Sequence, residues 1–318
     1  MGGRCLIASI LDRIAVLILL IGLGYLMGRL GILGGPMRKG ISNLILTLCL
    51  PCAILASANI PFTREQQITI VYVLAAAFVF YVVSFLIFTV VGHKLIPEPR
   101  KRGLYICLCT FANTSFVGFP IAQVLVGEIA IFYGSVFNIM YNLFMFTYGI
   151  YLLTGTRKGI GKMLRSAMLD PCALASFAMV AICLLQIKFP AFLNDGLNLL
   201  GNTCTPLAML VIGAGMTECR LHEVFSQRII YSVSIARLVV MPLLVFGALW
   251  LLKVDPVVSI VCTLMCAMPS GSLNSIFAEK YDCEPDFANK TVVQGNLLIL
   301  ITAPLLVALL GIAYPGVF

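Results

Sequence analysis

Long apolar segments follow one another along the whole chain, and they limit the possible folds more than any other feature. A helix needs roughly 20 apolar residues to cross a bilayer. Ten segments approach that length, at about 12–30, 40–60, 68–92, 103–125, 129–153, 171–187, 196–216, 229–252, 256–278 and 288–312. Only 11% of the residues are charged, against roughly 25% in a soluble domain. The sequence therefore predicts one all-α polytopic membrane protein of ten spans over residues 1–318.

The positive charges between the spans predict an orientation. If the connections after the odd-numbered spans face the cytoplasm, that side holds fourteen cations: Arg29, Arg38, Lys39, Lys94, Arg100, Lys101, Arg102, Arg157, Lys158, Lys162, Arg165, Arg220, Arg228 and Lys280. The other side holds five: Arg4, Arg13, Arg64, Lys188 and Lys253. Cytoplasmic loops carry an excess of Lys and Arg. We therefore expect a cell (inner) membrane protein with both termini outside the cytoplasm, and no nucleic-acid partner.

Several other classes of protein and site are disfavoured. No small-residue cleavage motif follows the first span, so we expect a retained span instead of a signal peptide. The C-x-x-C motif at Cys49 and Cys52 lies in the middle of an apolar span, where cysteine serves as a small apolar residue. His93 and His222 are not spaced as metal ligands. Neither a nucleotide-binding loop nor a converging set of acidic residues is present, so we expect no enzyme, metal or cofactor.

Two features recur at about half the chain length and predict an internal repeat. The motif P-x-A-x-L begins at Pro51 and again at Pro206, 155 residues later. A polar, proline-containing stretch around Pro120 has a counterpart around Pro269, 149 residues later. We therefore expect two repeats of five spans, 1–155 and 156–318. Because five is odd, the second repeat must have inverted topology, which is common among secondary transporters.

The fourth and ninth spans carry polar residues beside helix-breaking ones, at Asn113–Pro120 and Pro269–Asn274. Proline cannot donate a backbone hydrogen bond, and lipid cannot satisfy the groups that a break exposes. We therefore expect two broken helices around a binding site, with half-helix N-termini that favour an anion. The alternative is a pair of simple proline kinks packed by Ser and Asn side chains.

Three more polar residues lie within spans. Asn138 and Asn142 share a helix face because they are four residues apart, and they either border the site or form an interhelical hydrogen-bonding pair. Arg237 lies well inside the eighth span, where a charge needs a protein or water partner. It either binds a substrate carboxylate or pairs with a backbone carbonyl.

The stretch "ANTSFVGFPIA" resembles a signature of the auxin efflux carrier family, which belongs to the superfamily of bile-acid, arsenite and riboflavin transporters. Asn113, Thr114, Phe116, Gly118 and Pro120 match the signature, whereas Ser115 stands where the family usually has Gly. The stretches "TPLAMLVIGAGM", "PSGSLNSIFAEKY" and "YLMGRLGIL" are also similar. The resemblance covers essentially the whole chain, and the short central loop at about 154–170 is similar to that of bacterial members.

The resemblance implies a fold and a function. The fourth and ninth spans would cross at Pro120 and Pro269. The first, second, sixth and seventh spans would form a scaffold that mediates a homodimer, and spans 3–5 and 8–10 would form a moving transport domain. Plant members export the carboxylate auxin, and bacterial relatives are assigned to malate and malonate.

The sequence thus predicts a secondary transporter in the lipid bilayer that carries a small carboxylate by an elevator-type mechanism. The expected substrate-binding residues are Asn113, Thr114, Ser115, Phe116, Gly118, Pro120, Asn138, Asn142, Pro269, Ser270, Gly271, Ser272 and Asn274. A sodium-coupled symporter of the sister family is the alternative, and it would need carboxylates and carbonyls clustered at the crossing. A transporter-like membrane sensor is a further alternative, although such proteins usually carry an additional signalling domain.

Overall fold

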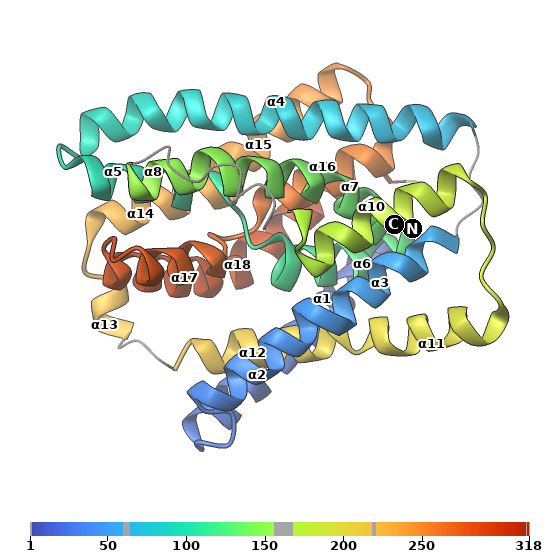
Figure 1. The fold of residues 1–318 in the computed structure, drawn as a ribbon, viewed down its shortest axis with the longest axis horizontal. Helices are drawn as coiled ribbons and strands as arrows, with labels where there is room; N and C mark the ends of the chain where they lie inside the picture. The colour runs from blue at the N-terminus through green and yellow to red at the C-terminus, as the bar shows by residue number, and fades with distance from the viewer. Residues whose placement is uncertain (1, 60–63, 156–167, 218–220, 316, 318) are drawn as a thin grey trace.

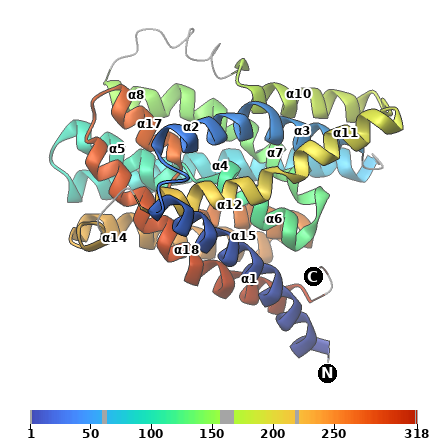
Figure 2. The same cartoon turned by 90° about the horizontal axis from the view of Figure 1, so that it is seen from below.

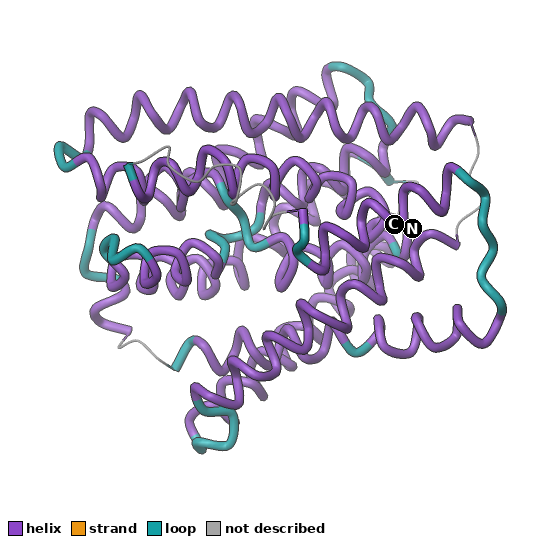
Figure 3. Tube along the Cα trace, in the orientation of Figure 1, coloured by secondary structure: helices purple, strands orange, loops and turns teal. Residues whose placement is uncertain are grey.

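A computed structural model describes residues 2–59, 64–155, 168–217, 221–315 and 317. All regular elements in this part of the chain are helices (Figures 1 and 3), and the pairing of Ala112 with Ser270 is an isolated antiparallel bridge. The all-helical prediction is therefore confirmed for the described residues. Five of the loop cations used to predict the orientation lie outside the described residues. They are the four in the connection at 156–167 and Arg220.

The helices of the first half are α1 (Gly2–Arg29), α2 (Gly35–Leu44), the π-helix η1 (Ile45–Cys49), α3 (Leu50–Ala56), the 3-10 turn η2 (Ser57–Asn59), α4 (Arg64–Leu95), α5 (Pro99–Thr110), the π-helix η3 (Thr114–Gly118), α6 (Phe119–Val126), α7 (Glu128–Phe144), the π-helix η4 (Met145–Gly149) and α8 (Ile150–Thr154). Those of the second half are α10 (Pro171–Leu184), α11 (Ala191–Asn202), α12 (Cys204–Gly215), α13 (Leu221–Val224), α14 (Arg228–Ile235), the π-helix η5 (Ala236–Val240), α15 (Met241–Leu251), α16 (Pro256–Ala267), α17 (Ser272–Lys280) and α18 (Pro285–Ala313).

Six helical segments are long and apolar enough to cross a membrane: Gly35–Ala56, Ile68–Leu95, Glu128–Thr154, Ala191–Gly215, Arg228–Leu251 and Pro285–Ala313. Four shorter apolar helices accompany them: Ala15–Arg29, Thr114–Val126, Pro171–Leu184 and Pro256–Ala267. Each apolar segment predicted from the sequence overlaps one of these helices. Successive segments run in alternating directions along the long axis, and the start of α1 and the end of α18 lie at the same end of the molecule (Figures 1 and 2).

Two of the apolar segments are interrupted where they pass each other. Helix α5 ends at Thr110, and an extended stretch leads into η3 at Thr114. Helix α16 ends at Ala267, and a second extended stretch leads into α17 at Ser272. The two stretches cross in the bridge between Ala112 and Ser270. The breaks predicted in the fourth and ninth spans are therefore present in the structure.

The predicted cause and place of the first break were wrong. Pro120 lies in the first turn of α6, beyond the crossing at Ala112. Three π-helices end two residues before a proline: η1 before Pro51, η3 before Pro120 and η5 before Pro242. A proline lacks an N–H and its ring clashes with the carbonyl four residues earlier. The wider π turn accommodates both effects, so these prolines widen the preceding turn and the helix continues.

Helices α1 and α12 pack with their backbones in close contact. Gly24 of α1 lies against the backbone of Leu210, and Gly213 of α12 lies against the backbone of Ile21 and Tyr25. A Cβ atom at either glycine would overlap these backbone atoms. Small residues allow such close contact between helices in a membrane, where packing replaces much of the hydrophobic driving force.

This contact predicts opposite effects for two glycines on α1. Gly24→Ala should destabilise the protein by about 1–3 kcal/mol, because the new methyl group overpacks the contact. Gly22→Ala is the matched control, since nothing lies within 4 Å of its Cβ position. It should be neutral or stabilising by up to about 1 kcal/mol, because Ala favours helix over Gly. Thermal unfolding in detergent tests both, and equal melting temperatures for the two variants would contradict the packing.

Candidate functional site

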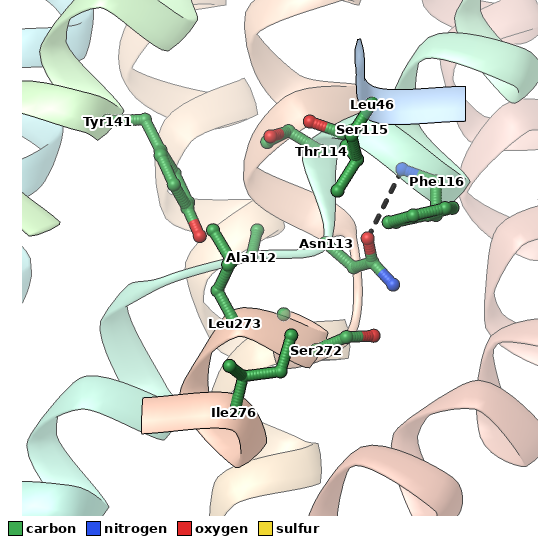
Figure 4. Close-up of a pocket in the computed structure, with 11 residues that line it drawn as sticks. Leu46, Ala112, Asn113, Thr114, Ser115, Phe116, Tyr141, Ser272, Leu273 and Ile276 are labelled. Carbon is green, nitrogen blue, oxygen red and sulfur yellow. Dashed lines mark hydrogen bonds between the residues drawn. The ribbon is translucent and has the colours of Figure 1, made fainter. Parts of the chain in front are cut away.

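A small cavity of about 50 Å³ lies beside the crossing of the two broken helices (Figure 4). Its lining residues are Leu46, Ala112, Asn113, Thr114, Ser115, Phe116, Tyr141, Gly271, Ser272, Leu273 and Ile276. Most of them come from the first residues after each break, in η3 and α17. The cavity therefore joins residues from the two halves of the chain, together with one residue of η1 and one of α7.

Asn113 begins the helix after the first break. Its side chain is 4% exposed, and its Oδ1 accepts a hydrogen bond from the backbone N–H of Phe116 at 3.2 Å. Figure 4 shows this bond and the amide nitrogen pointing away from it. The Nδ2 atom has no hydrogen-bond partner among the described residues. A primary amide nitrogen carries two donors, so Asn113 caps the helix with one atom and leaves the other available to a ligand.

The second break is held against the first by a set of short contacts. The backbone N–H of Asn113 donates to the carbonyl of Pro269 at 2.7 Å, and that of Gly271 donates to the carbonyl of Phe111 at 2.9 Å. A Cβ atom at Gly271 would lie 2.9 Å from the carbonyl oxygen of Ala112. Only glycine therefore fits at this position without displacing the extended stretch around Ala112.

Two polar side chains of the second break support the crossing from outside the cavity lining. The hydroxyl of Ser270 donates to the carbonyl of Leu108 at 2.7 Å. The Nδ2 atom of Asn274 donates to the carbonyl of Phe111 at 3.1 Å. Both residues are buried, and both satisfy carbonyls at the end of α5. Their contacts are those of structural braces for the break.

The structure thus divides the residues predicted for the site. Those that line the cavity are Asn113, Thr114, Ser115, Phe116, Gly271 and Ser272. Those that do not are Gly118, Pro120, Asn138, Asn142, Pro269, Ser270 and Asn274. Gly118 faces the side chains of Met265 and Met268 instead, and Pro269 packs on Gly295. Asn138 is buried, with its Oδ1 unpaired among the described residues.

Five lining residues were not predicted: Leu46, Ala112, Tyr141, Leu273 and Ile276. Ala112, Leu273 and Ile276 lie within or beside the predicted stretches, whereas Leu46 and Tyr141 come from other helices. Tyr141 lies on the same helix as Asn138 and Asn142, three residues after the first, and its hydroxyl lies 3.4 Å from the Cβ position of Gly271. Residues three apart share a helix face, but Asn138 itself does not line the cavity, so its spacing from Tyr141 does not single Tyr141 out. Leu46 belongs to η1, where nothing in the surrounding apolar sequence distinguishes it from its neighbours.

The cavity has no charged lining residue among the described side chains. Its polarity comes from hydroxyl and amide groups and from the helix ends that meet there. The helices Thr114–Val126 and α17 both begin at the cavity. The first N–H groups of a helix have no partner within it, and each helix N-terminus carries a partial charge of roughly +0.5. This arrangement suits a small anion.

Arg237 pairs with backbone carbonyls, which is the second of the two roles predicted for it. Its guanidinium donates to the backbone carbonyls of Met268 and Thr110, at distances of 3.0 and 3.2 Å. It is absent from the cavity lining. Within the described part of the chain, no group of three or more His, Cys, Asp or Glu side chains is placed to hold a metal ion.

Comparison with known proteins identifies the family of the chain. A family model described as "Membrane transport protein" matches residues 9–163 and again residues 155–307. An uncharacterized transporter of Methanocaldococcus jannaschii is 24% identical over 314 residues, which cover 93% of this chain and 96% of the relative. An uncharacterized transporter of Methanothermobacter thermautotrophicus is 23% identical over 307 residues, covering 92% and 96%.

The family match spans nearly the whole chain, and the transporters to which the chain is similar are covered almost completely. The structure adds several apolar helices of membrane-spanning length. The resemblance predicted from the signature around Asn113 is thereby confirmed. The chain is a multi-pass membrane protein that belongs to the membrane transport protein family, the family of the auxin efflux carriers.

Proposed function

We propose that this protein is a secondary transporter of small organic anions in the cell membrane, which works by alternating access. The observation that carries the proposal is the amide of Asn113. It is buried, its Nδ2 atom has no partner among the described residues, and it lines a cavity where two helices begin. A buried donor without a partner costs free energy, so a substrate acceptor such as a carboxylate would satisfy it.

The remaining lining suits the two ends of an organic anion. Hydroxyl groups of Thr114, Ser272 and Tyr141 can donate hydrogen bonds to a carboxylate beside the helix N-termini. Leu46 and Ile276 present apolar surface that can contact a carbon skeleton. Ligand sites in proteins commonly combine a mostly apolar lining with a few polar groups that fix orientation.

The size of the cavity supports a mechanism in which parts of the protein move. At about 50 Å³, it is much smaller than the roughly 300–1,000 Å³ of typical ligand pockets. An organic acid therefore needs a wider cavity than this conformation provides. Leu46 closes the cavity from the proposed scaffold, whereas the crossing belongs to the proposed transport domain. Displacement of one unit past the other would open the site.

The proposed architecture is ten spans in two inverted repeats, 1–155 and 156–318. Contacts recur in corresponding pairs: α4 packs on α5 as α15 packs on α16, and α6 packs on α7 as α17 packs on α18. The bridge residues Ala112 and Ser270 are 158 residues apart (270 − 112). This offset is close to the 155 residues between Pro51 and Pro206. The 149 residues between Pro120 and Pro269 differ more from that value.

The proposed scaffold consists of α1, α2 to α3, α10, and α11 to α12. These elements contact one another through the pairs α1–α12, α3–α11, α3–α10 and α2–α12. We propose that the scaffold stays fixed in the lipid and forms a homodimer, while the rest of the protein moves in an elevator-like manner. A sodium-coupled mechanism would need free oxygen ligands at the crossing, but the carbonyls of Met268 and Thr110 already accept from Arg237.

The proposal is tested by uptake of labelled carboxylates into proteoliposomes that contain the purified protein. The panel should include malate, malonate and indole-3-acetate, each with imposed pH, sodium and voltage gradients. Saturable uptake of at least one acid, absent from protein-free liposomes, is expected. Failure of every acid to enter or to compete would refute transport of organic anions.

Two substitutions of Asn113 should separate its effect on carboxylate affinity from its effect on thermal stability. Asn113→Ala should weaken carboxylate binding by about 5- to 150-fold, because it removes the buried donor. Asn113→Ser should weaken binding similarly while it retains the helix cap, since Ser is as good an N-cap as Asn. Binding isotherms and melting temperatures on the same preparations check both expectations.

Asn142→Ala is the matched control, because Asn142 is half-buried on α7 and does not line the cavity. It should leave the carboxylate affinity unchanged. If Asn113→Ser binds the acid as tightly as the unmodified protein, the amide of Asn113 is only a structural cap. The proposed function then loses the observation on which it rests.

A hydrogen bond between the proposed scaffold and the proposed transport domain allows a test of the movement. Its loss should change the ratio of the described conformation to the moved one. The hydroxyl of Thr205 on α12 donates to Oε1 of Gln123 on α6 at 3.0 Å, and Nε2 of Gln123 donates to Glu128 at 2.9 Å. An elevator movement must break the first bond. Thr205→Val should therefore destabilise the described conformation by about 1 kcal/mol, a roughly fivefold change in the ratio of states. Distances between spin labels on α12 and α6 measure this ratio.

Thr203→Val is the control for that experiment. The hydroxyl of Thr203 bonds to the carbonyl of Leu200 and to the sulfur of Cys49, both within the proposed scaffold. Its loss should lower the melting temperature and leave the distance distribution unchanged. Equal distributions for the Thr205→Val protein and the unmodified protein would argue against movement along this boundary.

The loop charges predict that both termini lie outside the cytoplasm. A reporter that is active only in the cytoplasm, fused after the last residue, should give no signal. The same reporter inserted between α8 and α10 should be active. The reverse pattern would overturn the proposed orientation.

A further inference from the structure

Arg237 is the largest fully buried side chain among the described residues, and its partners are the ends of two helices. It is 0% exposed. Its Nε and Nη2 atoms donate to the carbonyl of Met268 at 3.2 and 3.0 Å. Its Nη1 atom donates to the carbonyls of Thr110 and Cys109 at 3.2 and 3.4 Å. No carboxylate of the described residues forms an ion pair with it.

These carbonyls belong to the last residues of α5 and to the residue that follows α16. The C-terminus of a helix carries a partial charge of roughly −0.5. Two such ends together carry about one negative charge, which matches the single positive charge of the guanidinium. Arg237 therefore compensates both C-terminal ends at once, without using a carboxylate.

Four helix ends meet at the crossing, and their partial charges have different neighbours. The N-terminal ends of η3 and α17 border the cavity, whereas the C-terminal ends of α5 and α16 face Arg237. Without the guanidinium, the two positive and two negative ends would largely cancel. With it, the crossing carries a net positive charge although no described lining residue is charged.

We propose that Arg237 is a positioning residue whose charge makes this uncharged cavity select an anion over a neutral analogue. It acts through the helix ends and does not touch the substrate. This inference rests on the proposed function, because it concerns the preference of the same cavity. A purely structural role for Arg237 would hold the crossing together but would affect acids and their neutral analogues equally.

The test compares each acid with its amide. Affinities for indole-3-acetate and indole-3-acetamide, and for malonate and malonamide, are measured on the unmodified protein, Arg237→Lys and Arg237→Gln. Lys keeps the charge, and Gln keeps hydrogen-bond donors without it. The acid-to-amide preference should survive within a few-fold in Arg237→Lys and fall by roughly tenfold or more in Arg237→Gln. Equal preferences in the two variants would overturn the proposal, as would an equal loss of acid and amide binding.

Arg228→Gln is the matched control, because Arg228 begins the same segment but is exposed. It should leave the preference unchanged. If Arg237→Gln does not fold, Arg237→Ala is purified with methylguanidinium present. The added cation should restore the acid preference together with the fold, and a restored fold without the preference would contradict the role of the charge.

A second measurement does not depend on the substrate and so separates this inference from the proposed function. Ser115 lines the cavity and is half-buried, so Ser115→Cys places a thiol there. Its pKa, taken from the pH dependence of site-resolved alkylation, should rise by about one unit or more when Arg237→Gln is added. If no acid or amide binds the unmodified protein, the proposed function fails, and this rise or its absence still decides the role of Arg237.

Discussion

The structure depends on two helix breaks that satisfy each other inside a membrane. Lipid offers no hydrogen bonds to exposed backbone groups, so neither break could persist alone. The first break supplies the carbonyl of Phe111 to Gly271 and Asn274, and the second supplies the carbonyl of Pro269 to Asn113. The guanidinium of Arg237 binds carbonyls on both sides. The crossing is therefore a single unit, and residues far apart in the sequence hold their geometry through it.

The sequence predicts much of the fold because long apolar segments can satisfy their backbone in lipid only as helices. All of the predicted segments overlap apolar helices, and both breaks lie in the predicted spans. The position of the first break could not be predicted from Pro120. A proline that follows a π turn leaves the helix continuous, so its presence does not distinguish a widened turn from an end. Pro269, in contrast, lies within its break, directly before Ser270.

About half of the predicted site lines the cavity, and the division has a physical cause. A short polar side chain beside a break can face either a ligand or a freed backbone carbonyl, and the local sequence is the same in both cases. Ser272 lines the cavity, whereas Ser270, two residues earlier, bonds the carbonyl of Leu108. The direction of each side chain depends on the extended stretch of the other broken span, which packs against it. It could therefore not be predicted from the sequence of one span alone. Leu46 was missed for the same reason, since only the tertiary packing brings η1 to the cavity.

The placement of charge follows from these constraints. A cation that lined this cavity of about 50 Å³ directly would lose much of its hydration, and burying an unpaired charge is costly. Held against the C-terminal ends of α5 and α16, the guanidinium of Arg237 has partners in the described conformation that do not depend on a ligand in the cavity. The helix N-termini then face the cavity as partial charges, which cost far less to desolvate than a full one. A site of this kind can attract an anion without a charged lining, and under the proposed alternating-access mechanism it could also close when empty.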